Sequence, residues 1–183
     1  MIGLRGNGFT HPYLRYNNGS ASDVVTRVLN VSRIRLASPD DAIRIAQMSR
    51  DHIEQGLGWR WTPSRVLWSI RDKSTNVAVI HERGGLVGFG IMQYGENTAH
   101  LALLGVRPTQ RRRGLGTSLV AWLEKCALVA GIETIRVEAR ADNPRAIAFY
   151  REQDYRPSGT VAGYYQGTVD AVRMQKRLWN RGP

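Results

Sequence analysis

The most informative part of the sequence reads Val106-Arg107-Pro108-Thr109-Gln110-Arg111-Arg112-Arg113-Gly114-Leu115-Gly116-Thr117. It leaves an apolar run, passes through a basic turn and enters a helix whose apolar stripe ends at Gly131. The first backbone amides of a helix have no intrahelical partner and lie at the positive end of its dipole. Glycines let an anion approach those amides, and arginines add charged donors. The segment therefore predicts a phosphate-binding turn, whereas the plainer alternative is a solvated basic turn.

Upstream of this turn, three apolar runs read as consecutive strands: Val77–His81, Leu86–Tyr94 and Ala99–Val106. A glycine pair, Gly84-Gly85, predicts a hairpin turn between the first two strands. Two helices are expected before the strands, because serine, proline and acidic residues favour helix starts. One helix starts at Ser38-Pro39-Asp40-Asp41, and the other starts after Thr62-Pro63.

Downstream of the long helix, the pattern alternates between strand and helix: a strand at Ile135–Ala139, a helix at Asn143–Gln153, and strands at Thr160 and Val169–Leu178. Consecutive strands followed by strand–helix–strand imply a mixed sheet with helices on its faces. The fold class is therefore α/β or α+β in one domain. Residues 1–31 show no sustained period, so we expect an N-terminal extension there and a folded domain over residues 32–180.

The composition narrows the class of protein. The 183 residues, 42% hydrophobic and 22% charged, suit one globular domain. A net charge of +11, mostly from arginine, attracts polyanions such as nucleic acid, a phosphorylated cofactor or an acidic protein surface. No apolar run approaches the roughly 18 residues of a membrane span, and no secretory signal is evident, so we expect a cytoplasmic protein without a membrane partner. The single Cys126 and the unpatterned histidines predict no metal site.

The turn also resembles a known motif. Arg111-x-x-Gly114-x-Gly116 is similar to the Arg/Gln-x-x-Gly-x-Gly/Ala signature of the GCN5-related N-acetyltransferases. The resemblance covers about residues 32–179 and implies a mixed, mostly antiparallel sheet of six to seven strands flanked by about four helices. It also implies that the strand backbone near Leu104 and Val106 pairs with the pantetheine arm of acetyl-coenzyme A. The pyrophosphate would be held by the turn itself: Arg111, Arg112, Arg113, Gly114, Leu115, Gly116 and Thr117.

A second motif, Asn143-Pro144-Arg145-Ala146-Ile147-Ala148-Phe149-Tyr150, resembles the Asn-x-x-Ala-x-x-Leu/Phe-Tyr helix of the same family. The resemblance implies that Asn143 contacts the cofactor and that Tyr150 protonates the leaving thiolate, which a phenol of pKa about 10 can do. The alternative is that Tyr150 is a core aromatic. Relatives usually have Gly-Phe after this helix, whereas this chain has Asp154-Tyr155. Because aspartate tolerates a left-handed backbone, we expect the turn to survive.

Two further stretches resemble the ribosomal-protein-alanine and other protein N-terminal acetyltransferases: Glu138-Ala139-Arg140-Ala141-Asp142-Asn143, and Tyr164-Tyr165 followed by Asp170-Ala171-Val172-Arg173-Met174. In that group the glutamate is a proposed general base and the tyrosine loop helps to form the peptide groove. Glu138 could accept the amine proton if its surroundings raise its pKa. The competing interpretation pairs Glu138 with Arg136 or Arg140 on the sheet. His100 is an alternative base, although a half-buried strand histidine is the plainer interpretation.

Other residue types are weaker candidates. Cys126 falls on the apolar stripe of the long helix and is expected to be a small core residue. Trp59, Trp61 and Trp68 either line an acceptor pocket or pack the helical segment onto the sheet.

Together, these features favour an enzyme that transfers an acetyl group from acetyl-coenzyme A to a primary amine by direct attack. A protein N-terminal α-amine is one candidate acceptor, because its pKa of about 8 leaves it partly neutral at pH 7. The alternatives are a small amine, such as a polyamine, an aminoglycoside or an amino acid, and a basic RNA- or ribosome-binding module. Because the arginines cluster on a phosphate turn and not on an aromatic stacking surface, nucleic acid is not required.

Overall fold

The computed structural model describes residues 34–179, so the expected N-terminal extension at 1–31 lies outside the described residues. The elements follow in chain order: β1 (Ile34–Leu36), α2 (Ala42–His52), α3 (Pro63–Arg71), β2 (Thr75–Glu82), β3 (Gly85–Tyr94), β4 (Thr98–Val106), α4 (Leu115–Val129), β5 (Thr134–Arg140), α5 (Pro144–Glu152), β6 (Arg156–Tyr165) and β7 (Val169–Arg177). Short 3-10 turns precede α2 at Pro39–Asp41 and α4 at Pro108–Gln110. The expected fold class is confirmed.

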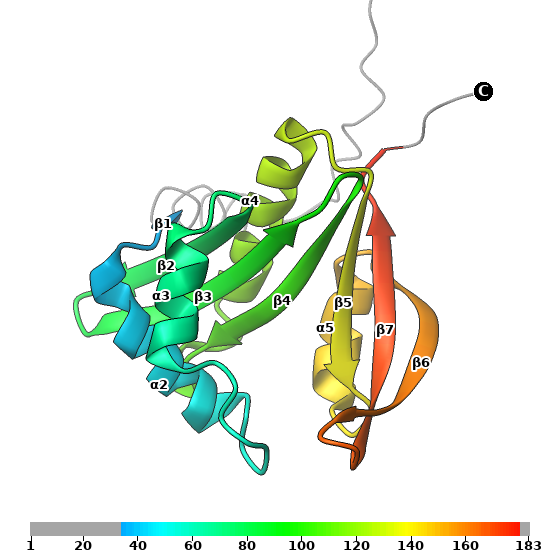
Figure 1. The fold of residues 1–183 in the computed structure, drawn as a ribbon, viewed down its shortest axis with the longest axis horizontal. Helices are drawn as coiled ribbons and strands as arrows, with labels where there is room; N and C mark the ends of the chain where they lie inside the picture. Colours follow the sequence, from blue (N-terminus) through cyan, green and yellow to red (C-terminus); the bar gives the residue numbers. More distant parts are fainter. Residues whose placement is uncertain (1–33, 180–183) are drawn as a thin grey trace, which may run out of the picture.

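All strands form one seven-stranded sheet in the order β1-β2-β3-β4-β5-β7-β6. Every neighbouring pair is antiparallel except β4 and β5, which run parallel and pair only where Thr98–His100 meets Thr134–Arg136. Beyond this short ladder the two strands diverge, as Figure 1 shows. We call the face that carries α2 and α3 the front face; α4 and α5 lie on the back face (Figure 1).

Each face of the sheet has its own hydrophobic core. The back core packs the predicted stripe of α4, including Leu115, Leu119 and Leu123, against the sheet and α5. The front core packs the buried sides of α2 and α3 against β2, β3 and β4. Because helices cover the front face only over β2 to β4, the front sides of β5 and β7 are left without a helix (Figure 1).

A β-bulge lies in β4 near the point where the strand leaves β5. Ile91 pairs with Leu103 and Met92 pairs with Leu101, so Ala102 is one residue more than β3 can match. Side chains two residues apart in a regular strand point to the same face of the sheet. The extra residue breaks this rule, since Leu101 belongs to the back core and Leu103 to the front core. Bulges of this kind bend a strand and often lie beside functional sites.

Both expected helix starts are confirmed. The backbone amide of Ser38 donates to Asp41 Oδ2 at 2.8 Å, and Thr62 Oγ1 accepts from the amide of Arg65. The β2–β3 hairpin differs by one residue from the prediction, because Glu82 pairs with Gly85 and the two loop residues are therefore 83 and 84. Gly85 begins β3 with a φ of +98°, a backbone angle that favours glycine.

Within residues 34–179, no helix combines the length and the apolar character that crossing a membrane requires.

Candidate active site

The phosphate-binding turn predicted from the sequence has a backbone suited to an anion. Arg112 and Gly114 are both left-handed, with φ values of +62° and +73°. Turns of this kind direct successive backbone amides toward one point, which makes concave anion sites. Gly114 is the N-cap of α4, and the amide of Ser118 makes a helical bond to Gly114 O at 2.9 Å. The amides of residues 115–117, in the first turn of α4, therefore have no acceptor within the helix.

The two glycines of the motif serve different purposes. A Cβ built on Gly114 would have no heavy atom within 4 Å, so this glycine borders open space and supplies a left-handed backbone. A Cβ on Gly116 would lie 3.4 Å from the ring of Phe149 and 3.7 Å from Val106. These are ordinary van der Waals distances, so Gly116 lies at the contact between α4 and α5, the helix that carries Tyr150, with room for a Cβ.

The three arginines of the turn are engaged to different degrees. Arg113 forms an ion pair with Glu82 at 3.1 Å and hydrogen-bonds Gln110. Arg111 Nε donates to the carbonyl oxygen of Val106 at 3.2 Å, which braces the turn against the end of β4. The side chain of Arg112 is exposed. Two of the three expected phosphate donors, Arg111 and Arg113, therefore also brace the turn.

The edge of β4 beyond His100 is available to an extended ligand. Leu104 and Val106 lie on the stretch that has no pairing with β5. Exposed strand edges bind extended chains through backbone hydrogen bonds. A strand edge followed directly by a turn suited to an anion fits a ligand with an amide-containing arm and a diphosphate head, which is the make-up of coenzyme A.

Helix α5 positions both Asn143 and Tyr150. Asn143 Oδ1 caps the helix by accepting the amide of Ala146 at 3.1 Å, which leaves its Nδ2 donors as the part able to contact a cofactor. Tyr150 is 7% exposed, and its ring lies edge-on to Phe149 and Tyr155 at centroid distances of 5.2 and 5.6 Å. Burial raises the pKa of Tyr150 well above its usual value, so its hydroxyl keeps its proton at neutral pH. The ring is thus a core aromatic, and the hydroxyl is protonated at neutral pH.

Glu138 lies on β5 with both carboxylate oxygens bound. His100 Nε2 is 2.6 Å from Oε2, and Arg173 Nε donates to Oε1 at 3.0 Å, while only 4% of the Glu138 side chain is exposed. Burial raises the pKa of this carboxyl, but the hydrogen bonds and charges of His100 and Arg173 outweigh burial, and the pKa is lowered overall. Glu138 is therefore ionised at neutral pH.

These partners differ from the ones that the competing interpretation gave Glu138. Arg140 pairs with Asp142 at 2.7 Å, and Arg136 has no ion pair within residues 34–179, so the alternative of pairing Glu138 with either arginine was wrong. The alternation of the strands explains the difference, because Glu138 stands opposite Arg173 of β7 in the antiparallel ladder. Since an ionised carboxylate only accepts, a neutral His100 carries its proton on Nε2.

Two loops meet beside this cluster on the front face. Tyr165 Oη donates to the carbonyl oxygen of Glu138 at 3.0 Å, and a Cβ on Gly58 would overlap the side chain of Gln166. Arg140 Nη1 also reaches the carbonyl of Gln55 at 3.4 Å. The loop between α2 and α3 (residues 53–62) therefore touches the β6–β7 hairpin, and the two flank the His100–Glu138–Arg173 cluster.

The same loop contains a buried carboxylate that the sequence did not reveal. Glu54, 7% exposed, accepts from Ser49 Oγ at 2.9 Å and from the amide of Arg60 at 2.8 Å. It therefore fixes the path of the loop beside the cluster. Nothing in the local pattern marks Glu54, because its partners lie in the backbone of a loop with no regular period. The sequence offered His100 as an alternative base, but it placed neither His100 nor Arg173 beside Glu138.

The remaining candidates have ordinary structural roles. Trp61 is buried in the front core beneath the guanidinium of Arg65, which agrees with the packing interpretation, whereas Trp59 and Trp68 are exposed. Burial raises the pKa of the half-buried Cys126, which keeps it a thiol. In the part of the chain that the structure describes, no three His, Cys, Asp or Glu side chains gather as metal ligands would.

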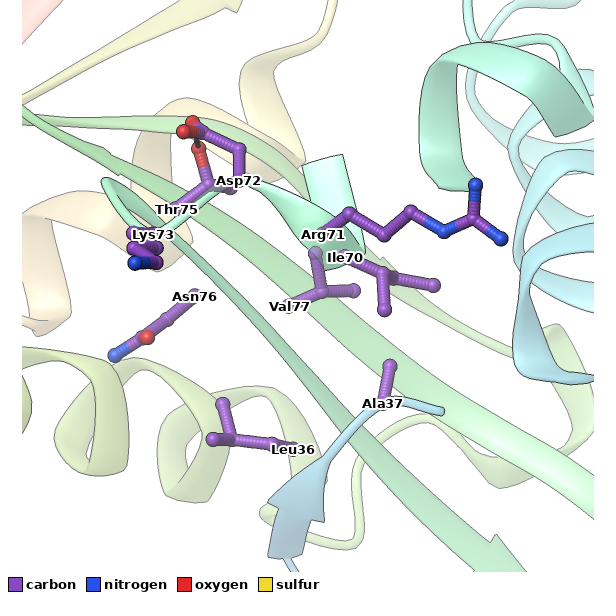
Figure 2. A pocket seen from close by; sticks show the side chains of 9 residues that line it. All are labelled: Leu36, Ala37, Ile70, Arg71, Asp72, Lys73, Thr75, Asn76 and Val77. Carbon is purple, nitrogen blue, oxygen red and sulfur yellow. Dashed lines mark hydrogen bonds between the residues drawn. The ribbon is translucent and has the colours of Figure 1, made fainter. Parts of the chain in front are cut away.

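A surface hollow lies at the other end of the sheet, where β1, the end of α3 and the start of β2 meet (Figure 2). Asp72 borders this hollow and accepts from Thr75 Oγ1 at 2.6 Å, a bond that closes the turn between α3 and β2. Because β3 and β4 separate the hollow from β5, it is distinct from the Glu138 cluster.

Comparison with known proteins agrees with this geometry. Residues 44–155 match the acetyltransferase (GNAT) family. The chain is 33% identical over 120 residues to an uncharacterised N-acetyltransferase of Methanocaldococcus jannaschii, covering 63% of this chain and 74% of that protein. It is 31% identical over 127 residues to the [ribosomal protein bS18]-alanine N-acetyltransferase of Escherichia coli K12, covering 67% and 85%. The crystal structure of Ard1 from Thermoplasma volcanium matches with a TM-score of 0.69 and 25% identity, covering 80% and 97%. This chain therefore belongs to the GNAT acetyltransferase family and is an acetyl-coenzyme A-dependent N-acetyltransferase.

Proposed function

We propose that this enzyme acetylates the α-amine at the N-terminus of a protein. The observation that carries the proposal is the state of Glu138, whose carboxylate is bound by both His100 and Arg173 and whose pKa is lowered. A carboxylate with a lowered pKa is a weak proton acceptor. The site therefore suits an acceptor that gives up its proton easily.

Amines differ strongly in this respect. An α-amine has a pKa of about 8 and a lysine side chain one of about 10.4. At pH 7, about a tenth of an α-amine is neutral, against well under a thousandth of a lysine amine. A protein N-terminus therefore places a small demand on Glu138, which would receive the proton directly or through water.

On the donor side, the backbone amides of residues 111–117 would hold the diphosphate, and Leu104 to Val106 would align the pantetheine arm along the β4 edge. The Nδ2 group of Asn143 would add a contact. When bound, acetyl-coenzyme A supplies a thioester carbon for attack by the amine and a thiol sulfur as leaving group. Residues 32–180 would form the complete catalytic domain, preceded by an extension at 1–31.

Tyr150 would supply the proton that the departing sulfur needs. Its hydroxyl is protonated at neutral pH, as an ordinary phenol is, and burial raises its pKa further. Helix α5 contacts the N-terminal turn of α4 through Phe149 and Gly116. Tyr165, whose hydroxyl donates to the carbonyl oxygen of Glu138, lies near enough to Tyr150 that an ionised Tyr165 would raise the pKa of Tyr150 further. This arrangement would place a proton donor, Tyr150, and a proton acceptor, Glu138, at two sides of one reaction centre.

The similarity to a bS18-alanine N-acetyltransferase supports the same acceptor class. The test is a turnover screen with acetyl-coenzyme A at pH 7. The acceptors are peptides with a free N-terminus, the same peptides with a blocked N-terminus and an internal lysine, polyamines and aminoglycosides. We expect the highest kcat/KM with free N-termini. Turnover confined to polyamines or aminoglycosides would remove the N-terminal assignment.

A further inference from the structure

The charged side chains on the front side of β5 and β7 are mainly basic. In an antiparallel ladder, residues directly opposite each other point to the same face. Glu138 stands opposite Arg173, Arg136 opposite Gln175, and Thr134 opposite Arg177, so these side chains share the face that bears Glu138. No α-helix lies in front of this part of the sheet (Figure 1). Glu138 is the one carboxylate among these six residues.

The α2–α3 loop adds a further arginine to this surface. Burial and the nearby Glu138 carboxylate raise the pKa of Tyr164, on the β6–β7 hairpin, and the guanidinium groups of Arg60, Arg136 and Arg173 act in the opposite direction. These groups come from the loop, from β5 and from β7, so they surround the Tyr164 hydroxyl from three elements. We call Arg60, Arg136 and Arg173 the basic rim of the acceptor site.

The charge of the rim is only partly balanced. Arg173 is bound to Glu138 at 3.0 Å. Arg60 and Arg136 are exposed and have no ion pair within residues 34–179. Two positive charges therefore face solvent beside the cluster, and the field they create favours an anionic ligand.

We infer that the acceptor is a polypeptide whose first residues after the acetylated one carry carboxylates, and that Arg60 and Arg136 bind them. The inference rests on the proposed function and names its substrate class. Arg136 precedes Glu138 by two residues on the same strand, a separation of about 7 Å. An extended acceptor with its amine at Glu138 would therefore bring its second or third residue to Arg136.

The same charges act against other acceptors. Polyamines and aminoglycosides carry several positive charges, which Arg60 and Arg136 repel. A nucleic acid would be attracted, but recognition of single strands relies on aromatic side chains for base stacking. The paired front-side positions of β5 and β7 hold arginine, glutamine, glutamate, threonine and alanine, and Tyr164 is the one ring that the rim surrounds, whereas single strands are bound by stacking successive bases on several rings. An acidic polypeptide is therefore the ligand that the surface fits best.

The test compares peptides with an identical N-terminal alanine and two aspartates, two asparagines or two lysines at positions 2 and 3. At low salt, we expect kcat/KM to be about tenfold higher for the aspartate peptide than for the asparagine peptide, as two exposed ion pairs allow. The lysine peptide should be the slowest. The preference should shrink as salt is added, because salt screens exposed charges.

Two variants locate the preference, and a third controls for charge. Arg60→Gln and Arg136→Gln should each reduce the ratio of aspartate to asparagine rates by about threefold. Lys125→Gln removes the same charge from an exposed position on α4, on the back face, and should leave the ratio unchanged. Because the readout is a ratio between two peptides, a general loss of activity does not imitate the result.

The outcomes separate the inference from the function on which it rests. Equal rates for the aspartate and asparagine peptides would overturn the acidic acceptor while N-terminal acetylation stands. Absence of turnover with every free N-terminus would overturn the proposed function itself. A preference that survives both arginine variants would overturn the assignment to the basic rim. If short RNA inhibits strongly and the peptides show no preference, the surface binds nucleic acid instead.

Discussion

The proposed donor side and the proposed acceptor side of this enzyme are built in different ways. The donor side we propose is the backbone of consecutive residues, 111–117, shaped by two left-handed residues and the start of α4. The acceptor side we propose is a set of side chains from three strands, with His100, Glu138 and Arg173 separated by 38 and 35 positions in the chain. A site made of backbone amides should keep its function when side chains that point away from it change, and should lose it when bulk or negative charge is added at the amides. A site made of side chains should lose function when any one of those groups is removed.

The largest expected effect is on the donor side. Gly116→Glu should abolish detectable binding of coenzyme A, because it puts a negative charge into the first turn of α4, where the amides are to receive phosphate. The fold should persist, since an acidic residue suits a helix N-terminus. Calorimetric titration with coenzyme A measures the effect. Gly159→Glu, at an open glycine of β6, is the matched control, and unchanged affinity in Gly116→Glu would locate the phosphate elsewhere.

The second effect tests the proton donor. Tyr150→Phe keeps the buried ring and removes one oxygen, so kcat should fall about 100-fold, the usual range for a general acid, while coenzyme A affinity changes little. Tyr155→Phe makes the same change in the neighbouring ring, whose buried hydroxyl lies beside the Glu124 carboxylate of α4 and away from the Glu138 cluster. This control should keep full activity at a small cost in stability. Full activity in a stable Tyr150→Phe protein would end the case for Tyr150.

The third effect tests the acceptor side through its pH dependence. Glu138→Gln should lower kcat/KM about tenfold at pH 6 and less at pH 9, where the amine is neutral without help. Coenzyme A affinity should stay the same. Glu96→Gln, at an exposed position in the β3–β4 turn, is the control. Superimposable pH–rate profiles for wild type and Glu138→Gln would show that the proton leaves by another route.

The thermal stability of the fold gives a second measurement on Glu138. Because the pKa of Glu138 is lowered in the folded protein, ionisation of Glu138 stabilises the fold above the ordinary glutamate pKa, and this contribution is lost as pH falls through the lowered value. The melting temperature of Glu138→Gln should therefore lie below that of wild type at pH 7. The gap should narrow below about pH 4. A gap that does not change with pH would mean that the ion pairs contribute nothing.

The smallest effect concerns the backbone of the turn. Gly114→Ala should cost about 1–2 kcal/mol of unfolding free energy, because alanine resists a φ of +73°. No neighbouring atom lies within 4 Å of the added Cβ, so the cost is conformational alone. Gly84→Ala, an equally open glycine without a positive φ, should change stability far less. Thermal denaturation of both variants measures the difference, and equal stability would argue against a strained turn.

Features set by neighbouring residues could be predicted from the sequence. The helix starts at Ser38 and Thr62, the α4 stripe and the turn that enters α4 each follow from residues within a few positions of each other. The left-handed turn at Asp154 was predicted for the same reason and is confirmed, with a φ of +67°. Local chemistry determined all of these, so a single sequence contained the necessary information.

The partners of Glu138 could not be predicted from residues near it in the sequence. Arg136 and Arg140 are its nearest basic neighbours in the sequence and share its face, yet the ladder brings Arg173 directly opposite. His100 Nε2 lies 2.6 Å from Glu138 Oε2 because β4 and β5 pair in parallel at their first residues. Both contacts depend on strand order and register, which place β7 between β5 and β6. Residue patterns in one strand do not determine which strand lies next to it.

The proposal that the acceptor is an N-terminal α-amine is tested most directly with one peptide that contains both a free N-terminal α-amine and an internal lysine. The enzyme, acetyl-coenzyme A and this peptide are mixed at pH 7, and the site of early acetylation is located by tandem mass spectrometry. The neutral fraction of the α-amine exceeds that of the lysine about 200-fold at this pH, so a weak acceptor such as Glu138 predicts modification almost entirely at the N-terminus. Acetylation of the lysine at an equal or higher rate would contradict the account.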